Sequence, residues 1–279
     1  MKKALLFRLA VLLAAMMCAL GAAAAEAYAC YTPSNMTLTF YYDDQRSIRS
    51  GTKYDLNTDE NSVGWHRDGT YENVTKVVFD PSFADARPTT TFDWFHDMTN
   101  LETITGMSYL STNEVTNMVW MFRGCAKLTS LDLSSFNTFK VTKMSYMFYD
   151  CGNLQTIYAS SSWSTAAVIN SEGMFWNCTS LVGGQGTTYD PNHIDKTYAH
   201  IDGGMSNPGY FTDKNASLRG DVNGDGSVSI SDVTALIDYL LTGNASGINM
   251  SGADTDQNSS INISDVTVII DYLLNGSWN

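Results

Sequence analysis

Oxygen-bearing side chains near the C-terminus occur in two sets with the same spacing. The first set stands at positions 1, 3, 5, 7, 9 and 12 of a short segment and comprises Asp221, Asn223, Asp225, Ser227, Ser229 and Asp232. The second set repeats these positions 33 residues later and comprises Asp254, Asp256, Asn258, Ser260, Asn262 and Asp265. A tight loop with this spacing turns alternate oxygens toward one hard cation, with a backbone carbonyl at position 7 and a carboxylate at position 12. The pattern predicts two Ca²⁺ ions, one per loop.

Electrostatic repulsion makes each loop depend on its ion. Three carboxylates per loop would repel one another at close range without a cation. Bound Ca²⁺ converts that repulsion into coordination, so we expect ion binding to drive folding. One acidic turn could simply be solvated, but a second copy with the same spacing argues against that explanation. Ser259 stands where the first loop has Gly226, and we therefore expect the second loop to be strained or weaker.

Each loop leads into a segment with the pattern of a helix. The two segments, SDVTALIDYLLTG and SDVTVIIDYLLNG, span Ser231–Gly243 and Ser264–Gly276. Apolar residues recur in them at helical spacing: Val233, Leu236, Ile237, Leu240 and Leu241, then Val266, Ile269, Ile270, Leu273 and Leu274. Ser231 or Asp232 caps the start of the first helix, and Gly243 ends it. We expect the two apolar stripes to pack on each other as a pair of helices with pseudo-twofold symmetry.

The duplicated segment DVNGDGSVSISD…DTDQNSSINISD resembles a type I dockerin, the calcium-dependent module that inserts into cohesin modules of scaffold proteins. The resemblance implies a small all-α domain of tandem F-hand loop–helix motifs over residues 219–279, with Ca²⁺ as cofactor and a cohesin as partner. The residues that stand where a partner would make contact are Ile230, Ser231, Tyr239, Ile263, Ser264 and Tyr272. The helices lack the Lys and Arg that well-studied dockerins use against cohesin. A true EF-hand is the alternative, but no amphipathic helix precedes either loop.

The charge of the chain excludes one class of function. The 279 residues carry 16 Lys+Arg against 29 Asp+Glu, for a formal net charge of -13. Nucleic-acid binding needs clustered cations to neutralise phosphates, and this chain lacks them. Eight aspartates and one arginine give residues 219–279 a charge of -7. The acidic excess therefore matches calcium binding in that segment and solubility elsewhere.

Residues 1–25 have the features of a secretory signal peptide. A basic start precedes an apolar run from Leu9 to Leu20, and small residues follow up to Ala25, after which we expect cleavage. The apolar run is shorter than the roughly 20 residues that span a bilayer, so we expect a secreted protein rather than an anchored one. Removing the three cations of this segment changes the formal charge from -13 to -16. Lipidation at Cys18 or Cys30 is the alternative.

The central part of the chain repeats with a period of 26 or 27 residues. Equivalent positions hold Phe95, Phe122, Phe148 and Phe175, and also Leu101, Leu128, Leu154 and Leu181. A period of this length predicts stacked units, each with a short helix or helical turn, as over Val115–Cys125, and a strand, as over Leu128–Leu133. Cys125, Cys151 and Cys178 share the period, so we interpret them as small buried core residues. A metal or redox site is the alternative for them, but no histidine stands at matching spacing.

The repeats VTNMVWMFRGCAKLTSLDLSSFNT and VTKMSYMFYDCGNLQTIY resemble the BspA-like leucine-rich-repeat family of bacterial surface proteins. The resemblance implies an α/β leucine-rich-repeat-like solenoid over residues 81–212 with an adhesive surface for an undefined ligand. Residues 26–80 contain strand-like segments, Thr37–Tyr42 and Val74–Phe79, and we expect them to form a β-rich N-terminal cap. Residues 213–218 would link the repeats to the dockerin.

Two classes of function follow from these features. The first is a secreted, non-catalytic binding protein, held at the cell surface through a cohesin-bearing scaffold, whose repeats meet an extracellular protein or glycan. Candidate surface positions for that ligand are Ser130, Asp132, Tyr158 and Trp163, whose alternative role is ordinary surface or core. The second is a carbohydrate-active enzyme, such as a glycoside hydrolase, or an accessory glycan-binding subunit of a cellulosome-like complex for polysaccharide breakdown.

The sequence favours the first class. Glycoside hydrolysis needs two carboxylates that face each other across a cleft. The nearest candidates in sequence are Asp93, Asp97, Glu102 and Glu114, and nothing marks any two of them as an acid–base pair. The four histidines, His66, His96, His193 and His200, show no spacing typical of metal ligands. We therefore expect a binding protein without catalytic activity.

Overall fold

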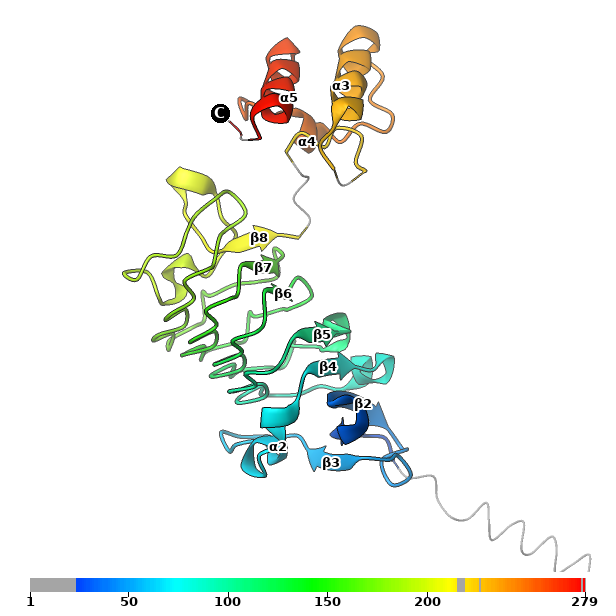
Figure 1. The fold of residues 1–279 in the computed structure, drawn as a ribbon, viewed down its shortest axis with the longest axis vertical. Coiled ribbons are helices and arrows are strands. Elements are labelled where there is room, and N and C mark those ends of the chain that lie inside the picture. The colour runs from blue at the N-terminus through cyan, green and yellow to red at the C-terminus, as the bar shows by residue number, and fades with distance from the viewer. Residues whose placement is uncertain (1–23, 215–218, 226, 277, 279) are drawn as a thin grey trace, which may run out of the picture. The chain divides into compact units, whose positions relative to one another are not determined.

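The computed structural model describes residues 24–214, 219–225, 227–276 and 278. The chain forms two compact units, Met1–Lys214 and Asn215–Asn279, which we describe separately. The fold is mixed α/β, with two open sheets in the first unit and helices in the second (Figure 1). Residues 1–23 of the predicted signal peptide, residues 1–25, and residues 215–218 of the predicted linker, residues 213–218, lie outside the described residues.

The first sheet lies in the N-terminal part of the first unit. Its strands are β1 (Glu26–Thr32), β2 (Thr37–Asp43), β3 (Thr52–Asp55), β4 (Lys76–Phe79) and β5 (Thr103–Thr105). Their order is β3-β1-β2-β4-β5, with antiparallel pairing of β1 to β2 and β3 and parallel pairing of β4 to β2 and β5. The short helix α2 (Gly64–Arg67) lies between β3 and β4 in the chain. The strands predicted within residues 37–42 and 74–79 are thus present.

The second sheet is parallel and belongs to the repeats. It contains β6 (Ser130–Asp132), β7 (Thr156–Ala159) and β8 (Phe211–Asp213), in that order. Because β5 pairs with the first sheet, the strands of the repeats are divided between two open sheets, and the expected leucine-rich-repeat-like solenoid is not detected among the described residues. Single parallel bridges join the units at another edge, including Asn117 to Lys143 and Lys143 to Asn170.

The expected helical segment over residues 115–125 is a series of tight turns. The amides of Met121 and Cys125 bond to carbonyls three residues earlier. Alternate amides, at Met118, Trp120, Phe122 and Gly124, donate instead to carbonyls of the next unit. An α-helix needs those amides for its own i−4 carbonyls, so hydrogen bonding between units prevents a helix here.

The repeated phenylalanines and cysteines form the core, as predicted. The rings of Phe95, Phe122, Phe148 and Phe175 are buried and follow one another at centroid distances of 5.4, 5.7 and 5.4 Å. Cys125, Cys151 and Cys178 are free and buried. Each thiol donates to the carbonyl of the phenylalanine in the preceding unit, at 2.9–3.1 Å. Burial raises the pKa of Cys151 to about 12, so this thiol stays protonated at neutral pH.

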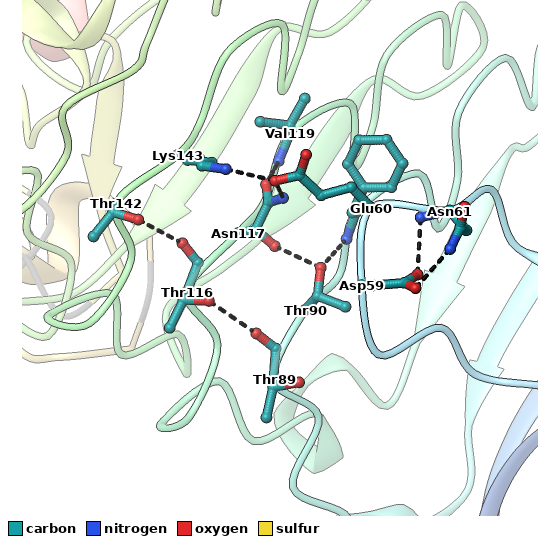
Figure 2. Close-up of polar contacts among 11 residues, drawn as sticks. Asp59, Glu60, Asn61, Thr89, Thr90, Thr116, Asn117, Val119, Thr142 and Lys143 are labelled. Atoms are coloured by element: carbon teal, nitrogen blue, oxygen red, sulfur yellow. Dashed lines mark hydrogen bonds and ion pairs between the residues drawn. The ribbon is translucent and has the colours of Figure 1, made fainter.

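A loop from the N-terminal segment lies against the edge of the repeats (Figure 2). The Glu60 carboxylate pairs with Lys143 and accepts a hydrogen bond from the Asn117 amide at 3.3 Å. Next to it, the hydroxyls of Thr116 and Thr142 each donate to the carbonyl of the equivalent threonine one unit earlier, at 3.4 and 3.3 Å. These contacts fix the N-terminal segment to two successive units.

Trp163 is a correction to the candidate ligand surface. Its side chain is buried, and its indole N–H donates to the carbonyl of Ala199 at 3.0 Å. Its ring also packs edge-on against Phe211, with centroids 4.9 Å apart. Ser130 and Asp132 are exposed, and Tyr158 is half-buried beneath Lys214. Trp163 therefore belongs to the core that closes the C-terminal end of the repeats.

The second unit contains the predicted pair of helices. Its elements are α3 (Ile230–Thr242), α4 (Met250–Ala253) and α5 (Ile263–Asn275), and α3 packs against α5. Its buried core consists of Val222, Val233, Leu236, Ala253, Val266 and Ile269. The outer members of the predicted stripes, including Ile237, Leu241, Ile270 and Leu274, remain exposed. The expected packing of the two helices on each other is therefore present, and it buries only the sides of the stripes that face each other.

Asp202 organises the last loops of the first unit from a buried position. Its carboxylate accepts hydrogen bonds from the amides of Gln185, Thr187, Gly204 and Gly209 and from the Thr187 hydroxyl, at 2.7–3.3 Å. Burial alone would raise the pKa of Asp202, but the hydrogen bonds, led by that from Thr187, hold it below its ordinary value. The charged carboxylate therefore stabilises the fold.

We predict that Asp202→Asn lowers the free energy of unfolding by about 2 kcal/mol at pH 7, because an amide cannot accept all of these hydrogen bonds. A folded-state pKa below the unfolded value of about 3.9 means that this stabilisation is present above that pH and is lost as the pH falls through the folded pKa. Urea unfolding at pH 7 and pH 3 measures the difference, with the exposed Asp85→Asn as control. Equal losses at both pH values would contradict this role.

Candidate metal centre

The aspartates at position 12 join each acidic loop to its helix. Asp265 is buried in the first turn of α5, where Oδ1 accepts from the amides of Thr255 and Asp256 at 2.7 and 3.0 Å. Its Oδ2 accepts from the amide of Asn262 at 2.8 Å, and the Asn262 side chain caps the helix in return. Asp232 makes the equivalent contacts at the start of α3. Each carboxylate therefore holds a loop in shape at both of its ends.

The second loop gathers three carboxylates around one point. Asp254, Asp256 and Asp265 each offer an oxygen, and these oxygens lie within 4.8 Å of one another. The Oδ1 atom of Asp254 is buried and has no hydrogen-bond partner among the described residues. A buried carboxylate oxygen without a donor is costly, and a cation removes that cost. Three carboxylates form a set of hard oxygen donors that fits Ca²⁺.

The other predicted ligands of the second loop surround this group. The Asn258 side chain accepts from the Ser260 amide at 2.8 Å, and Asn262 accepts from the Ser264 amide at 2.9 Å. The Ser264 hydroxyl donates to Asp256 at 2.6 Å, and this bond lowers the pKa of Asp256. The Asp256 carboxylate is thus kept in its charged form, which is the form that binds a cation.

The first loop is arranged differently. The Asp225 amide donates to the side chains of Asp221 and Asn223 at 3.0 and 2.9 Å. The Ser227 hydroxyl donates to Asp225 at 2.6 Å and lowers the pKa of that carboxyl. Among the described residues, the three carboxylates of the second loop lie close enough together to share one ion, whereas those of the first loop do not. The carboxylates therefore converge in the second loop, which is the loop that we expected to be strained or weaker.

Backbone strain in the second loop is nevertheless present. Ser259 has a φ of 67° and Gln257 a φ of 58°, both in the left-handed region. In the first loop the residue equivalent to Gln257 is Gly224, with a φ of 71°. A left-handed conformation costs a residue with a side chain on the order of 1 kcal/mol, whereas glycine adopts it freely. The prediction of strain at Ser259 is confirmed.

Ser259→Gly is expected to raise the calcium affinity of the second loop about fivefold, because it relieves about 1 kcal/mol of strain in the bound conformation. Calorimetric titration of the full chain with Ca²⁺ measures this change. Ser260→Gly is the matched control, since Ser260 lies outside the left-handed region. A gain of the same size in both variants would argue against strain as the cause.

Two family models match the chain. Residues 219–274 match the dockerin type I domain. Residues 89–202 match a family described as Mycoplasma protein of unknown function, DUF285. The chain carries a DUF285 domain and a C-terminal dockerin type I domain. Searches of curated proteins and of solved structures find no match.

The predicted partner contacts of the dockerin domain differ in their surroundings. Ile230 and Ile263 open the two helices and are 70% and 68% exposed. Tyr239 packs against the domain core, whereas Tyr272 stacks on Trp278 with centroids 4.0 Å apart. The isoleucines are therefore free to meet a partner, while the tyrosines already have neighbours within the domain.

Ser231 and Ser264 brace the acidic loops. The Ser231 hydroxyl accepts from the Asn223 amide at 3.1 Å, and the Ser264 hydroxyl donates to Asp256. Both serines lie two residues after the position-9 residue, Ser229 or Asn262, which caps the helix, so the expected cap at Ser231 or Asp232 is corrected to Ser229. Their hydroxyls link the geometry of the loops to the helix ends that carry Ile230 and Ile263.

The structure also brings together three residues that lie apart in the sequence. His66, Asp93 and His96 offer ligand atoms within 4.8 Å of one another, and His66 Nε2 and Asp93 Oδ2 are buried without a hydrogen-bond partner among the described residues. The two imidazole rings stack nearly parallel, 4.8 Å apart, and His96 Nε2 accepts from Arg123 at 2.8 Å. Lone pairs of parallel rings do not converge on one point. We therefore assign this group to packing between α2 and the repeats.

Proposed function

We propose that this chain is a secreted, non-catalytic binding protein that its dockerin domain attaches to a cohesin-bearing scaffold in a calcium-dependent way. The observation that carries the proposal is the convergence of Asp254, Asp256 and Asp265 around a buried, unpartnered oxygen, in a duplicated loop–helix domain that matches type I dockerins. A dockerin suggests an extracellular assembly of the cellulosome type. Among the described residues, no helix is both long and apolar enough to cross a membrane.

Calcium would act here by ordering the partner surface. We propose two ions, one per loop, held by the side chains at positions 1, 3, 5, 9 and 12 and by the carbonyls of Ser227 and Ser260. The bound ion supplies the positive charge that lets the three carboxylates of a loop stay together. Because Asp232 and Asp265 lie in the first turns of α3 and α5, a fixed loop also fixes the start of each helix.

The helices present duplicated apolar faces that fit a protein partner. Residues spaced i, i+4, i+7 and i+11 share one face of a helix. On α3 these are Ile230, Thr234, Ile237 and Leu241, and on α5 they are Ile263, Thr267, Ile270 and Leu274, all of them exposed. Exposed apolar patches mark interaction sites. The absence of Lys and Arg from both helices predicts a cohesin whose contact surface is apolar rather than acidic.

Calcium dependence is the direct test of attachment. In a pull-down of the full chain by immobilised cohesins, we expect capture in Ca²⁺ and release in chelator. The double variant Asp221→Ala/Asp254→Ala should abolish capture, because each loop loses its position-1 ligand. Asp238→Ala/Asp271→Ala, which removes the same charge from the helices, is the matched control and should retain calcium dependence. Capture that persists in chelator would refute the proposal.

The duplication itself makes a second prediction. Either Ile230→Asp or Ile263→Asp alone should retain cohesin capture, because the other copy offers an equivalent face. The double variant should lose at least tenfold in affinity, since buried charges replace both apolar contacts. Calcium titration should be unchanged in all three, and Ile48→Asp, at an exposed position of the first unit, is the control. If one single variant lost as much cohesin affinity as the double variant, the contact would belong to that helix alone, which would contradict the symmetric surface.

We propose that the DUF285 domain supplies the ligand-binding part of the protein and performs no catalysis. Two of the carboxylates considered for hydrolysis are engaged in ion pairs, Glu102 with Lys127 at 3.3 Å and Glu114 with Lys140 at 2.7 Å. A third, Asp93, is buried against His96. Screening the secreted chain for glycan hydrolysis tests this part, and sustained turnover would overturn it.

A further inference from the structure

Aromatic side chains line one face of successive repeat units outside the core. Trp120 and Tyr146 stand two residues before the buried phenylalanines of their units, while Tyr149 and Trp176 stand one residue after. Parallel neighbouring strands lie about 4.8 Å apart, so equivalent positions in bridged units recur at about that interval. The four rings therefore follow the direction in which the units stack.

These rings form a continuous strip with one arginine. The Tyr149 ring lies 5.8 Å from Tyr146 and 6.3 Å from Trp176, and its plane is within 15° of that of Trp176. The Arg123 guanidinium lies 5.7 Å from the Trp120 ring and 5.2 Å from the Tyr149 ring. Trp120, Arg123, Tyr146 and Tyr149 line a shallow hollow of about 300 Å³. Trp176 extends the strip and is 48% exposed.

The backbone beneath the strip carries a conformational cost, and at Trp120 this cost is accompanied by packing on the buried Phe92 and His96 rings, at 5.3 and 5.2 Å. The position two residues before the phenylalanine is left-handed in all four units, with a φ of 67° at Asp93, 61° at Trp120, 58° at Tyr146 and 58° at Gly173. Glycine is the residue that suits this conformation, and the last unit has it. The two central units instead place large aromatic side chains there, at an expense on the order of 1 kcal/mol each. Strain of this kind is typical of binding sites.

Polar groups along the strip favour a sugar. The Tyr146 hydroxyl bonds to Glu172, and the Asp150 carboxylate accepts from the Asn177 amide. Carboxylates and amides bond to hydroxyl groups, while aromatic faces stack on the apolar C–H faces of pyranose rings. The exposed carboxylates and the net charge of -13 disfavour acidic polysaccharides. A protein partner would remove water from these carboxylates without supplying the hydroxyl donors that a sugar offers, and that desolvation would be costly.

We propose that this strip is a binding site for a neutral β-1,4-linked polysaccharide that lies along the stacked units. The interval between units is close to the length of one β-1,4-linked pyranose, so successive sugars meet successive aromatic side chains. The Arg123 guanidinium lies over both the Trp120 and the Tyr149 rings, where its N–H groups can donate to sugar hydroxyls. This inference names the ligand class of the binding role proposed above for the DUF285 domain and does not depend on the dockerin domain.

Affinity electrophoresis and calorimetry of the full chain test the site, with hydroxyethylcellulose, glucomannan and arabinoxylan as probes and with dextran and polygalacturonate as comparison polymers. We expect binding to at least one neutral β-1,4-linked probe and to neither comparison polymer. Trp120→Ala and Trp176→Ala should each weaken that binding at least tenfold. Phe139→Ala, which removes a 59% exposed aromatic ring elsewhere in the repeats, should not. No binding to any β-1,4-linked probe, or equal losses in all three variants, would overturn the proposal.

Tyr146→Gly separates a role in binding from a role in folding. Glycine suits the left-handed backbone, so the thermal midpoint should stay the same or rise while polysaccharide affinity falls. A lower midpoint with unchanged affinity would make Tyr146 a structural residue and contradict the proposal. Repeating the titration in chelator separates the two functions, because glycan binding should persist where cohesin capture is lost. Failure of only one of the two activities then refutes only the corresponding proposal.

Discussion

Buried carboxylates need donors, and both units of this chain are organised around that requirement. Asp265 meets it with three backbone amides, and Asp202 meets it with four amides and a hydroxyl. Each of these side chains fixes loops that have little regular structure of their own. Where the requirement is not met, at Asp254 Oδ1, two other carboxylates lie close by. A cation would satisfy these three groups together, so the same rule that builds the loops also accounts for the candidate metal centre.

Features set by local spacing could be predicted from the sequence. The two C-terminal helices and the buried cysteines depend on residues separated by one turn or one repeat, and the structure contains both features. For residues 115–125 the spacing predicted a short helix or helical turn, and it could not decide between a helix and the tight turns that form. The amides of Met118 and Trp120 bond to the next unit, and only the three-dimensional stacking of units shows that competition. The half-exposed helix stripes have the same origin, because burial depends on which elements meet.

The candidate metal centre and the histidine cluster show where spacing in the sequence fails to predict which side chains converge on a site. Position 6 of the second loop correctly indicates strain, yet the carboxylates converge in that loop, because convergence depends on the turns of several residues together. His66 and His96 come from different elements, so nothing in their spacing relates them. Their parallel stacking also shows that proximity of ligand types does not make a metal site unless the lone pairs converge. Whether either group can hold a metal ion therefore has to be decided from the three-dimensional geometry.

The repeats offer an internal comparison that separates packing from function. Two residues after each core phenylalanine the backbone is left-handed, and the residues there are Asp97, Gly124, Asp150 and Asn177, all of types that tolerate it. Two residues before the phenylalanine the backbone is equally left-handed, yet the central units have tryptophan and tyrosine. The conformational cost is the same at both positions, but Trp120 gains contacts with the Phe92 and His96 rings in return, whereas the Tyr146 ring contacts Tyr149, another member of the strip. A local rule that is obeyed on one side of the turn and broken at Tyr146 on the other is what the proposed binding role of that ring would require.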